Sequence, residues 1–122
     1  MNGRGPVDAE RLDAFLHAFY ARGRRDALVG PVFRSAVEDW DDFLAAMGRF
    51  WRKAVFDEVI DLGIPPERLK LGHTRESLAR LQQIWSDTAG EFFTGDDAAR
   101  VRTVGDRVFR RAVRVEDGLS DL

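Results

Sequence analysis

Few side chains in this 122-residue sequence carry the chemistry of a catalytic or metal-binding group. There are two histidines, His17 and His73, one tyrosine, Tyr20, and no cysteine. The lack of cysteine excludes thiolate nucleophiles, zinc–thiolate sites, iron–sulfur clusters and disulfides. Any imidazole chemistry, as a general base or as a metal ligand, therefore falls to His17 or His73.

The common catalytic motifs do not occur in the sequence. It has no His-Glu-x-x-His pattern, no phosphate-binding glycine loop and no Ser-His-Asp order supported by glycine turns. Asp57 and Asp61 are one helical turn apart, but nothing around them predicts a raised pKa, and we interpret them as exposed charges. The residues alone therefore predict a protein that is not an enzyme.

Two clusters of charge have ordinary structural interpretations. The arginines of the C-terminal region alternate with valines, which is typical of a solvated helix face. They are Arg100, Arg102, Arg107, Arg110, Arg111 and Arg114. An acidic group suits the positive end of a helix dipole and lacks the glycine-punctuated spacing of a calcium loop. It consists of Glu38, Asp39, Asp41 and Asp42. Since 19 Lys and Arg face 21 Asp and Glu, we expect no nucleic-acid partner and no membrane partner.

Length and composition predict one domain over residues 1–122, with flexible ends at 1–7 and 116–122. Hydrophobic residues make up 44% of the chain and include nine Phe and three Trp, enough for a core without disulfides or a metal. The N-terminus lacks the apolar stretch of a signal peptide, and no apolar run approaches the ~20 residues that span a bilayer. These features predict a soluble, cytoplasmic protein.

The spacing of apolar residues is helical throughout, which predicts an all-α fold. Four long helices are expected, over residues 8–25, 40–62, 74–92 and 97–115. Asp8, Asp39 and Thr74 are suitable N-caps for the first three. Shorter helical turns are expected over 26–37, with Leu28, Val32 and Phe33 facing inward, and over 67–71, after Pro65 and Pro66.

Short motifs along these helices occur in a distinctive order. They are Phe19-Tyr20-Ala21-Arg22, Asp26, Gly30-Pro31-Val32-Phe33, Trp40, Phe50-Trp51, Leu69-Lys70-Leu71, Thr74-Arg75-Glu76, Ile84-Trp85 and Glu91-Phe92-Phe93. Taken together over roughly residues 8–115, they resemble the group III truncated haemoglobins. The resemblance implies a truncated globin-like 2-on-2 helical sandwich.

The resemblance also implies a pocket. In that family the fold encloses haem b on a proximal His, and a distal Tyr, matched here by Tyr20, faces a bound gas. The positions expected to line such a pocket are Tyr20, Phe33, Phe43, Met47, Phe50, Trp51, Arg68, Leu71, His73, Leu81 and Trp85.

Three of these positions depart from the family pattern. Arg68 stands at the position of the proximal His, Phe43 at that of a distal His, and Leu81 where many members have Trp. A guanidinium has no lone pair to give to iron, so Arg68 is expected either to point into solvent or to bind an anion. His17, three residues before Tyr20, is expected to be a partly exposed helix residue.

His73 is the one remaining candidate for a metal ligand on the proximal side. It follows Arg68 by five residues, which on a continuous helix is ~140° of rotation and ~7.5 Å of rise, and therefore the wrong side. Gly72 interrupts the helix, so a loop could instead bring His73 beneath an iron.

Three functions agree with these residues. The first is a binding or sensory protein of globin fold without haem or another cofactor, which takes a small apolar ligand or a protein partner and forms a homodimer. The second is a haem b protein that binds oxygen or another diatomic gas, with Tyr20 distal and His73 as iron ligand. The third is a helical interaction module with a filled core. Haem redox chemistry is the only enzymatic activity that the resemblance would imply.

Overall fold

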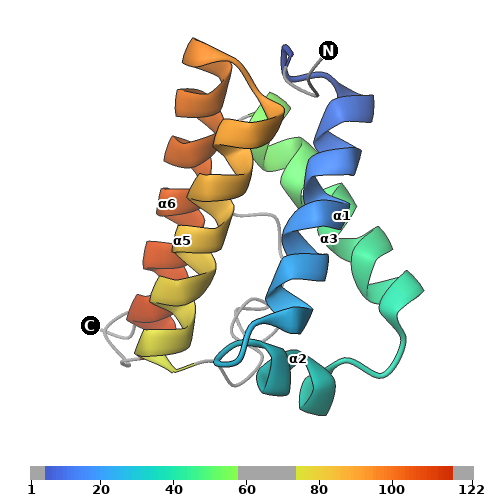
Figure 1. The fold of residues 1–122 in the computed structure, drawn as a ribbon, viewed down its shortest axis with the longest axis vertical. Coiled ribbons are helices and arrows are strands. Elements are labelled where there is room, and N and C mark those ends of the chain that lie inside the picture. The colour runs from blue at the N-terminus through green and yellow to red at the C-terminus, as the bar shows by residue number, and fades with distance from the viewer. Residues whose placement is uncertain (1–4, 58–73, 117–122) are drawn as a thin grey trace.

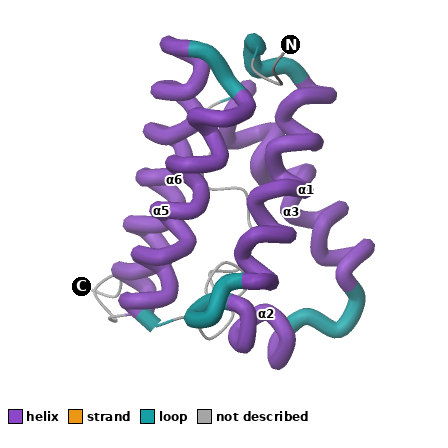
Figure 2. The backbone as a smooth tube through the Cα atoms, viewed as in Figure 1, coloured by secondary structure: helices purple, strands orange, loops and turns teal. Residues whose placement is uncertain are grey.

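The described part of the protein is built of helices. The computed structural model describes residues 5–57 and 74–116, the last six as backbone only. In chain order the helices are α1 (Ala9–Arg25), α2 (Gly30–Ala36), α3 (Trp40–Phe56), α5 (Arg75–Phe92) and α6 (Gly95–Glu116) (Figure 1). Helices and loops alone make up the tube in Figure 2, and the described residues contain no strand. The all-α prediction is confirmed.

Three helices begin where the sequence predicts a cap. The carboxylate of Asp8 accepts a hydrogen bond from the N–H of Arg11 at 2.7 Å, and that of Asp39 accepts from Asp42 at 3.1 Å. The hydroxyl of Thr74 accepts from the N–H of Ser77 at 3.1 Å. Each cap satisfies a backbone donor that has no partner inside its helix, so these helix starts are encoded locally.

The end of α3 differs from the prediction. The apolar period continues to Val59 and suggested a helix to about residue 62, but α3 ends at Phe56 with Asp57 as its C-cap. Aspartate competes with the backbone for hydrogen bonds and is a poor helix residue, a local effect that periodicity does not detect. Residues 58–62 lie outside the described part.

Helix α5 packs against both α6 and α1. Helices α5 and α6 run antiparallel, joined by a tight turn in which Gly95 has a φ of 25°, a conformation that favours glycine. Helix α1 packs against α5, α3 and the short α2, and α3 also reaches α6 (Figure 1).

The beginning of the described chain is attached to the α5–α6 turn. The N–H of Gly5 donates to the carbonyl of Phe92 at 3.1 Å, and the carbonyl of Gly5 accepts from Thr94 at 3.2 Å. The N–H of Val7 donates to Asp97 at 3.1 Å. Gly5 and Val7, which the sequence assigned to a flexible end, are thus hydrogen bonded to the α5–α6 turn and the start of α6.

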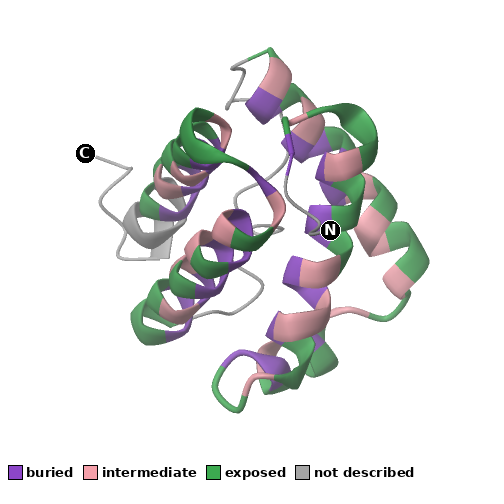
Figure 3. Cartoon of the chain, turned by 45° about the horizontal axis from the view of Figure 1, so that its top comes forward, coloured by how far each residue is buried: buried purple, intermediate pink, exposed green. Residues whose placement is uncertain are grey.

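The buried faces of the helices point toward one another, as Figure 3 shows. The predicted inward residues of α1 and α5, such as Leu12, Phe15 and Leu78, are buried, except that Phe92 is only partly buried and its neighbour Phe93 is buried instead. The prediction was wrong at Leu28, which is 47% exposed, while its neighbour Val29 is buried. The carboxylate of Asp26 accepts the N–H groups of both residues at 3.0 Å, and this turn directs Val29 rather than Leu28 into the core.

Candidate functional site

An aromatic cluster fills the space where α1, α3, α5 and α6 meet. We define it as Phe19, Tyr20, Trp51, Trp85 and Phe109, all 7% exposed or less. The rings of Trp51 and Trp85 lie 4.1 Å apart between centroids, and Phe19 meets Trp85 edge to face at 5.0 Å. Phe109 lies within 6.2 Å of Phe19 and of both tryptophans. Such contacts stabilise the core beyond the area that they bury.

One hydrogen bond joins the two polar groups of α1 and α3 in this cluster. The indole N–H of Trp51 donates to the hydroxyl oxygen of Tyr20 at 2.8 Å. Burial raises the pKa of Tyr20, and the hydrogen bond from Trp51 offsets only part of that rise. The phenol is therefore neutral at physiological pH and keeps its proton. The hydroxyl can also donate one hydrogen bond, and no acceptor for it is found among the described residues.

Phe43 and Phe33 cover Tyr20 on the side of α2. The ring of Phe43 lies 5.3 Å from that of Tyr20, and the ring of Phe33 lies 6.0 Å from it, both edge to face. Trp40 packs on Phe43 at 5.3 Å, and the guanidinium of Arg24 lies 4.1 Å above Trp40. A hydrocarbon ring therefore occupies the position that the resemblance assigns to a distal His.

Trp85 is held in place by α6. Its indole N–H donates to the carbonyl of Val101 at 2.9 Å, and the side chain is fully buried. Gly105 gives the indole its space, because a Cβ at this position would lie 2.2 Å from the indole nitrogen. Neither Gly105 nor Phe109 was among the predicted core or pocket residues. Their helical spacing of four and eight residues from Val101 was the available signal.

Eight of the predicted pocket residues lie in the described part, and the structure brings most of them together. A continuous set of ring contacts links Phe33, Phe43, Tyr20, Phe50, Trp51 and Trp85, completed by the Tyr20–Trp51 hydrogen bond. Met47 and Leu81 are buried beside them, at 2% and 3% exposure. The other three predicted residues, Arg68, Leu71 and His73, lie outside the described residues.

The described side chains do not provide a suitable ligand for a haem iron. Iron needs a ligand with a free lone pair, and the side chains of this kind are His17, Met47 and Tyr20. His17 is exposed on the outer side of α1. The oxygen of Tyr20 accepts from Trp51, and its raised pKa disfavours the phenolate that iron would bind. Met47 is a single weak donor without an opposing base among the described residues.

His17 lines a separate groove on the surface between α1 and α3. This outer groove has a volume of about 330 Å³. Its lining consists of Asp13, Leu16, His17, Asp41, Leu44, Ala45, Gly48, Arg49 and Arg52. Arg52 donates to Asp13 across it at 2.9 Å. The prediction that His17 is an accessible helix residue is confirmed, and the groove lies apart from the aromatic cluster.

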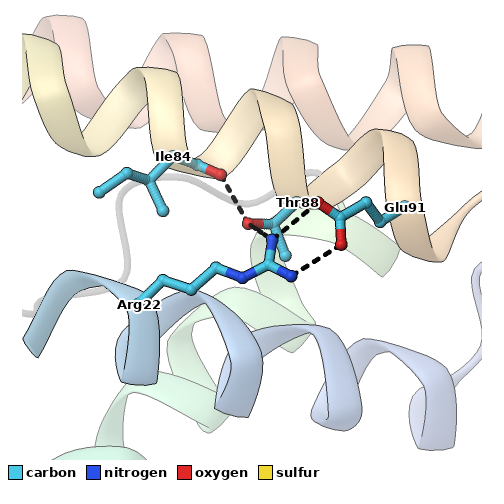
Figure 4. A network of polar contacts seen from close by, with 4 residues as sticks. All are labelled: Arg22, Ile84, Thr88 and Glu91. Atoms are coloured by element: carbon cyan, nitrogen blue, oxygen red, sulfur yellow. Dashed lines mark hydrogen bonds and ion pairs between the residues drawn. The ribbon is translucent and has the colours of Figure 1, made fainter. Parts of the chain in front are cut away.

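A polar network joins α1 to α5 through Arg22, Thr88 and Glu91 (Figure 4). Arg22 makes two hydrogen bonds to the carboxylate of Glu91, at 2.7 and 3.0 Å, and a third to the buried hydroxyl of Thr88 at 2.9 Å. Thr88 in turn donates to the carbonyl of Ile84 at 2.7 Å. The hydrogen bonds from Arg22 lower the pKa of Glu91. The network thus connects the Phe19-Tyr20-Ala21-Arg22 motif to the Glu91-Phe92-Phe93 motif. It holds α1 against α5 at Arg22.

Comparisons of the chain with protein-family models, with curated proteins and with solved structures give no match. The described side chains contain no group of three His, Asp or Glu residues able to hold a metal ion. None of the described helices has the length and apolar character that crossing a bilayer requires.

Proposed function

We propose that this chain is a binding or sensory protein of globin-like fold, similar to the group III truncated haemoglobins, in which the family's haem ligation is lost. In this proposal Tyr20 donates a hydrogen bond to a small, mostly apolar ligand. Helix α5 packs on α6, and α1 contacts both α5 and α3; these contacts are compatible with the helical sandwich proposed.

The proposal rests on the buried hydroxyl of Tyr20, which accepts from Trp51 and finds no acceptor for its own proton in the described part of the chain. A buried donor without an acceptor costs about 1–3 kcal/mol, and a ligand that supplies an acceptor atom recovers that cost. The acceptor must reach a phenol that the rings of Phe33 and Phe43 cover, so the rest of the ligand would contact hydrocarbon. A neutral molecule with an apolar body and one oxygen fits these conditions, whereas an ion does not.

Haem is not needed for this chemistry, and the departures at the resembling positions argue against it. The distal position carries Phe43, whose ring packs directly on Tyr20. Arg68, at the position of the proximal His, has no lone pair with which to bind iron.

A matched pair of probes tests the proposal. Acetophenone and ethylbenzene have nearly the same shape, but only acetophenone carries a carbonyl oxygen. We expect acetophenone to raise the melting temperature of the wild-type protein and to change its tryptophan fluorescence, to which Trp51, the donor to Tyr20, contributes. In Tyr20→Phe its affinity should fall by about tenfold, while ethylbenzene should behave alike in both proteins. Equal affinity of acetophenone for the two proteins, or no binding at millimolar concentration, contradicts the proposal.

Titration with haemin tests the loss of ligation separately. We expect no Soret band at one haem per chain. A stoichiometric Soret band that disappears in His73→Ala and persists in His17→Ala would establish a haem protein with His73 as its ligand instead.

A further inference from the structure

The outward face of α3 carries opposite charges placed symmetrically about a small residue. Asp41, Ala45 and Arg49 are exposed, follow one another at intervals of four residues and line the outer groove. We call these three residues the α3 face. Because α3 is continuous over Trp40–Phe56, the two charges lie about 6 Å on either side of Ala45 along the helix axis.

This spacing makes the α3 face complementary to itself. If two copies pack with their α3 helices antiparallel about a two-fold axis at Ala45, Asp41 of each copy lies level with Arg49 of the other. A parallel arrangement would instead place like charges level with one another. From this pattern we propose that a second copy of the chain docks on the α3 face as an antiparallel, two-fold dimer.

The residues near the proposed axis permit close approach. Ala45 is exposed and presents only a methyl group, so at this residue the two helix axes can come within about 8–9 Å of each other. The half-buried Leu44 and the buried Leu16, which is 4% exposed, line the bottom of the groove with apolar side chains. Neither Asp41 nor Arg49 has a hydrogen bond or an ion pair within the described part of its own chain. Their charges are therefore available to a second copy.

The contact is expected to be weak and sensitive to salt. A helix of 17 residues is about 25 Å long, and one helix face buries less than the roughly 800 Å² per partner typical of stable complexes. We therefore expect dissociation constants of tens of micromolar or more. Since exposed charges provide the orientation, the dimer should weaken strongly at about 1 M salt, where the Debye length is about 3 Å.

Charge reversal provides a sharp test by sedimentation equilibrium. Asp41→Arg gives a copy whose α3 face carries only positive charge, and Arg49→Asp gives one with only negative charge. Each variant alone should dimerise about tenfold more weakly than the wild type, because the two-fold axis doubles every change. An equimolar mixture of the two variants should form a heterodimer within about threefold of the wild-type affinity, since all the facing charges are again opposite.

Asp42→Arg is the matched control, because Asp42 is exposed in the same first turn of α3 but does not line the groove. It alters the interaction with the helix dipole as Asp41→Arg does, yet should leave dimerisation within about twofold. Circular dichroism of each variant confirms that the helices are intact. A monomeric wild type at 1 mM chain in low salt, or a mixture no more associated than its components, overturns the proposal. It stands independently of the proposed ligand at Tyr20.

Discussion

Replacement of Gly105 by alanine should destabilise the protein, although alanine is the better helix residue. The added Cβ would lie 2.2, 2.5 and 2.7 Å from three atoms of the Trp85 indole. Trp85 cannot yield easily, because it is fully buried, contacts Phe19 and Trp51, and donates to the carbonyl of Val101. The substitution therefore forces a shift of α6 away from α5, a displacement of the indole, or both.

The expected cost follows from opposing contributions. Overpacking of a filled core costs about 1–3 kcal/mol, and a displaced indole N–H without its acceptor costs a further 1–3 kcal/mol or so. The gain in helix propensity from glycine to alanine returns about 1 kcal/mol. We expect a net loss of about 2–4 kcal/mol in the free energy of unfolding, which for a chain of this length lowers the melting temperature by about 10 °C.

Urea unfolding followed by tryptophan fluorescence measures this loss, since Trp85 is one of the three tryptophans that contribute to the signal. Gly48→Ala is the control, because it also replaces a glycine inside a helix. There the new Cβ would lie 3.3 Å from the flexible end of Arg52, so the variant should be about 0.5–1 kcal/mol more stable than the wild type. If Gly105→Ala is as stable as Gly48→Ala, the close packing of α6 on Trp85 described above is incorrect.

Three further substitutions probe the polar contacts between helices. Burial acts to raise the pKa of Asp26, but the hydrogen bond from Arg80 and two backbone N–H groups outweigh it and lower the pKa. Asp26→Asn should therefore cost about 1–2 kcal/mol at pH 7, measured by urea unfolding, and the difference should close as pH falls below about 4, where the wild type loses the ionised form. Glu91→Gln should show the same pH dependence with a smaller amplitude, because the pair with Arg22 is largely exposed. Thr88→Val should lower the free energy of unfolding by at most about 1 kcal/mol, because Arg22 keeps its hydrogen bonds to Glu91. A larger loss would show that the bond to Thr88 is the one that holds α1 in place.

The helices and their starting residues were predictable because the physics that sets them is local. A cap such as Asp8 or Thr74 acts on an N–H three residues away, and a buried face repeats within one helix. The same locality explains the two errors. The apolar period gave no sign that α3 ends at Phe56, and it could not distinguish Leu28 from Val29 until the turn at Asp26 was known.

The partners across helices were not predictable in the same way. The pattern places Tyr20 and Trp51 on inward faces, but which inward groups meet across 31 residues depends on how the helices cross. The ion pair of Arg22 with Glu91 spans 69 residues and is likewise a product of packing. The resemblance of the motifs suggested which positions would gather, and it suggested nothing about the orientation of the Tyr20 hydroxyl.

Packing alone does not account for the Tyr20–Trp51 pair. Within a cluster of hydrocarbon rings, phenylalanine at both positions would bury comparable surface without any polar atom to satisfy. The pair satisfies the indole N–H, whereas the phenol proton finds no acceptor among the residues that the structure describes. Trp85 shows the contrast, since its N–H reaches a backbone carbonyl and nothing remains unpaired. A ligand with an acceptor atom would accept a hydrogen bond from Tyr20, just as the carbonyl of Val101 accepts one from Trp85. The proposed function rests on the Tyr20 hydroxyl for this reason.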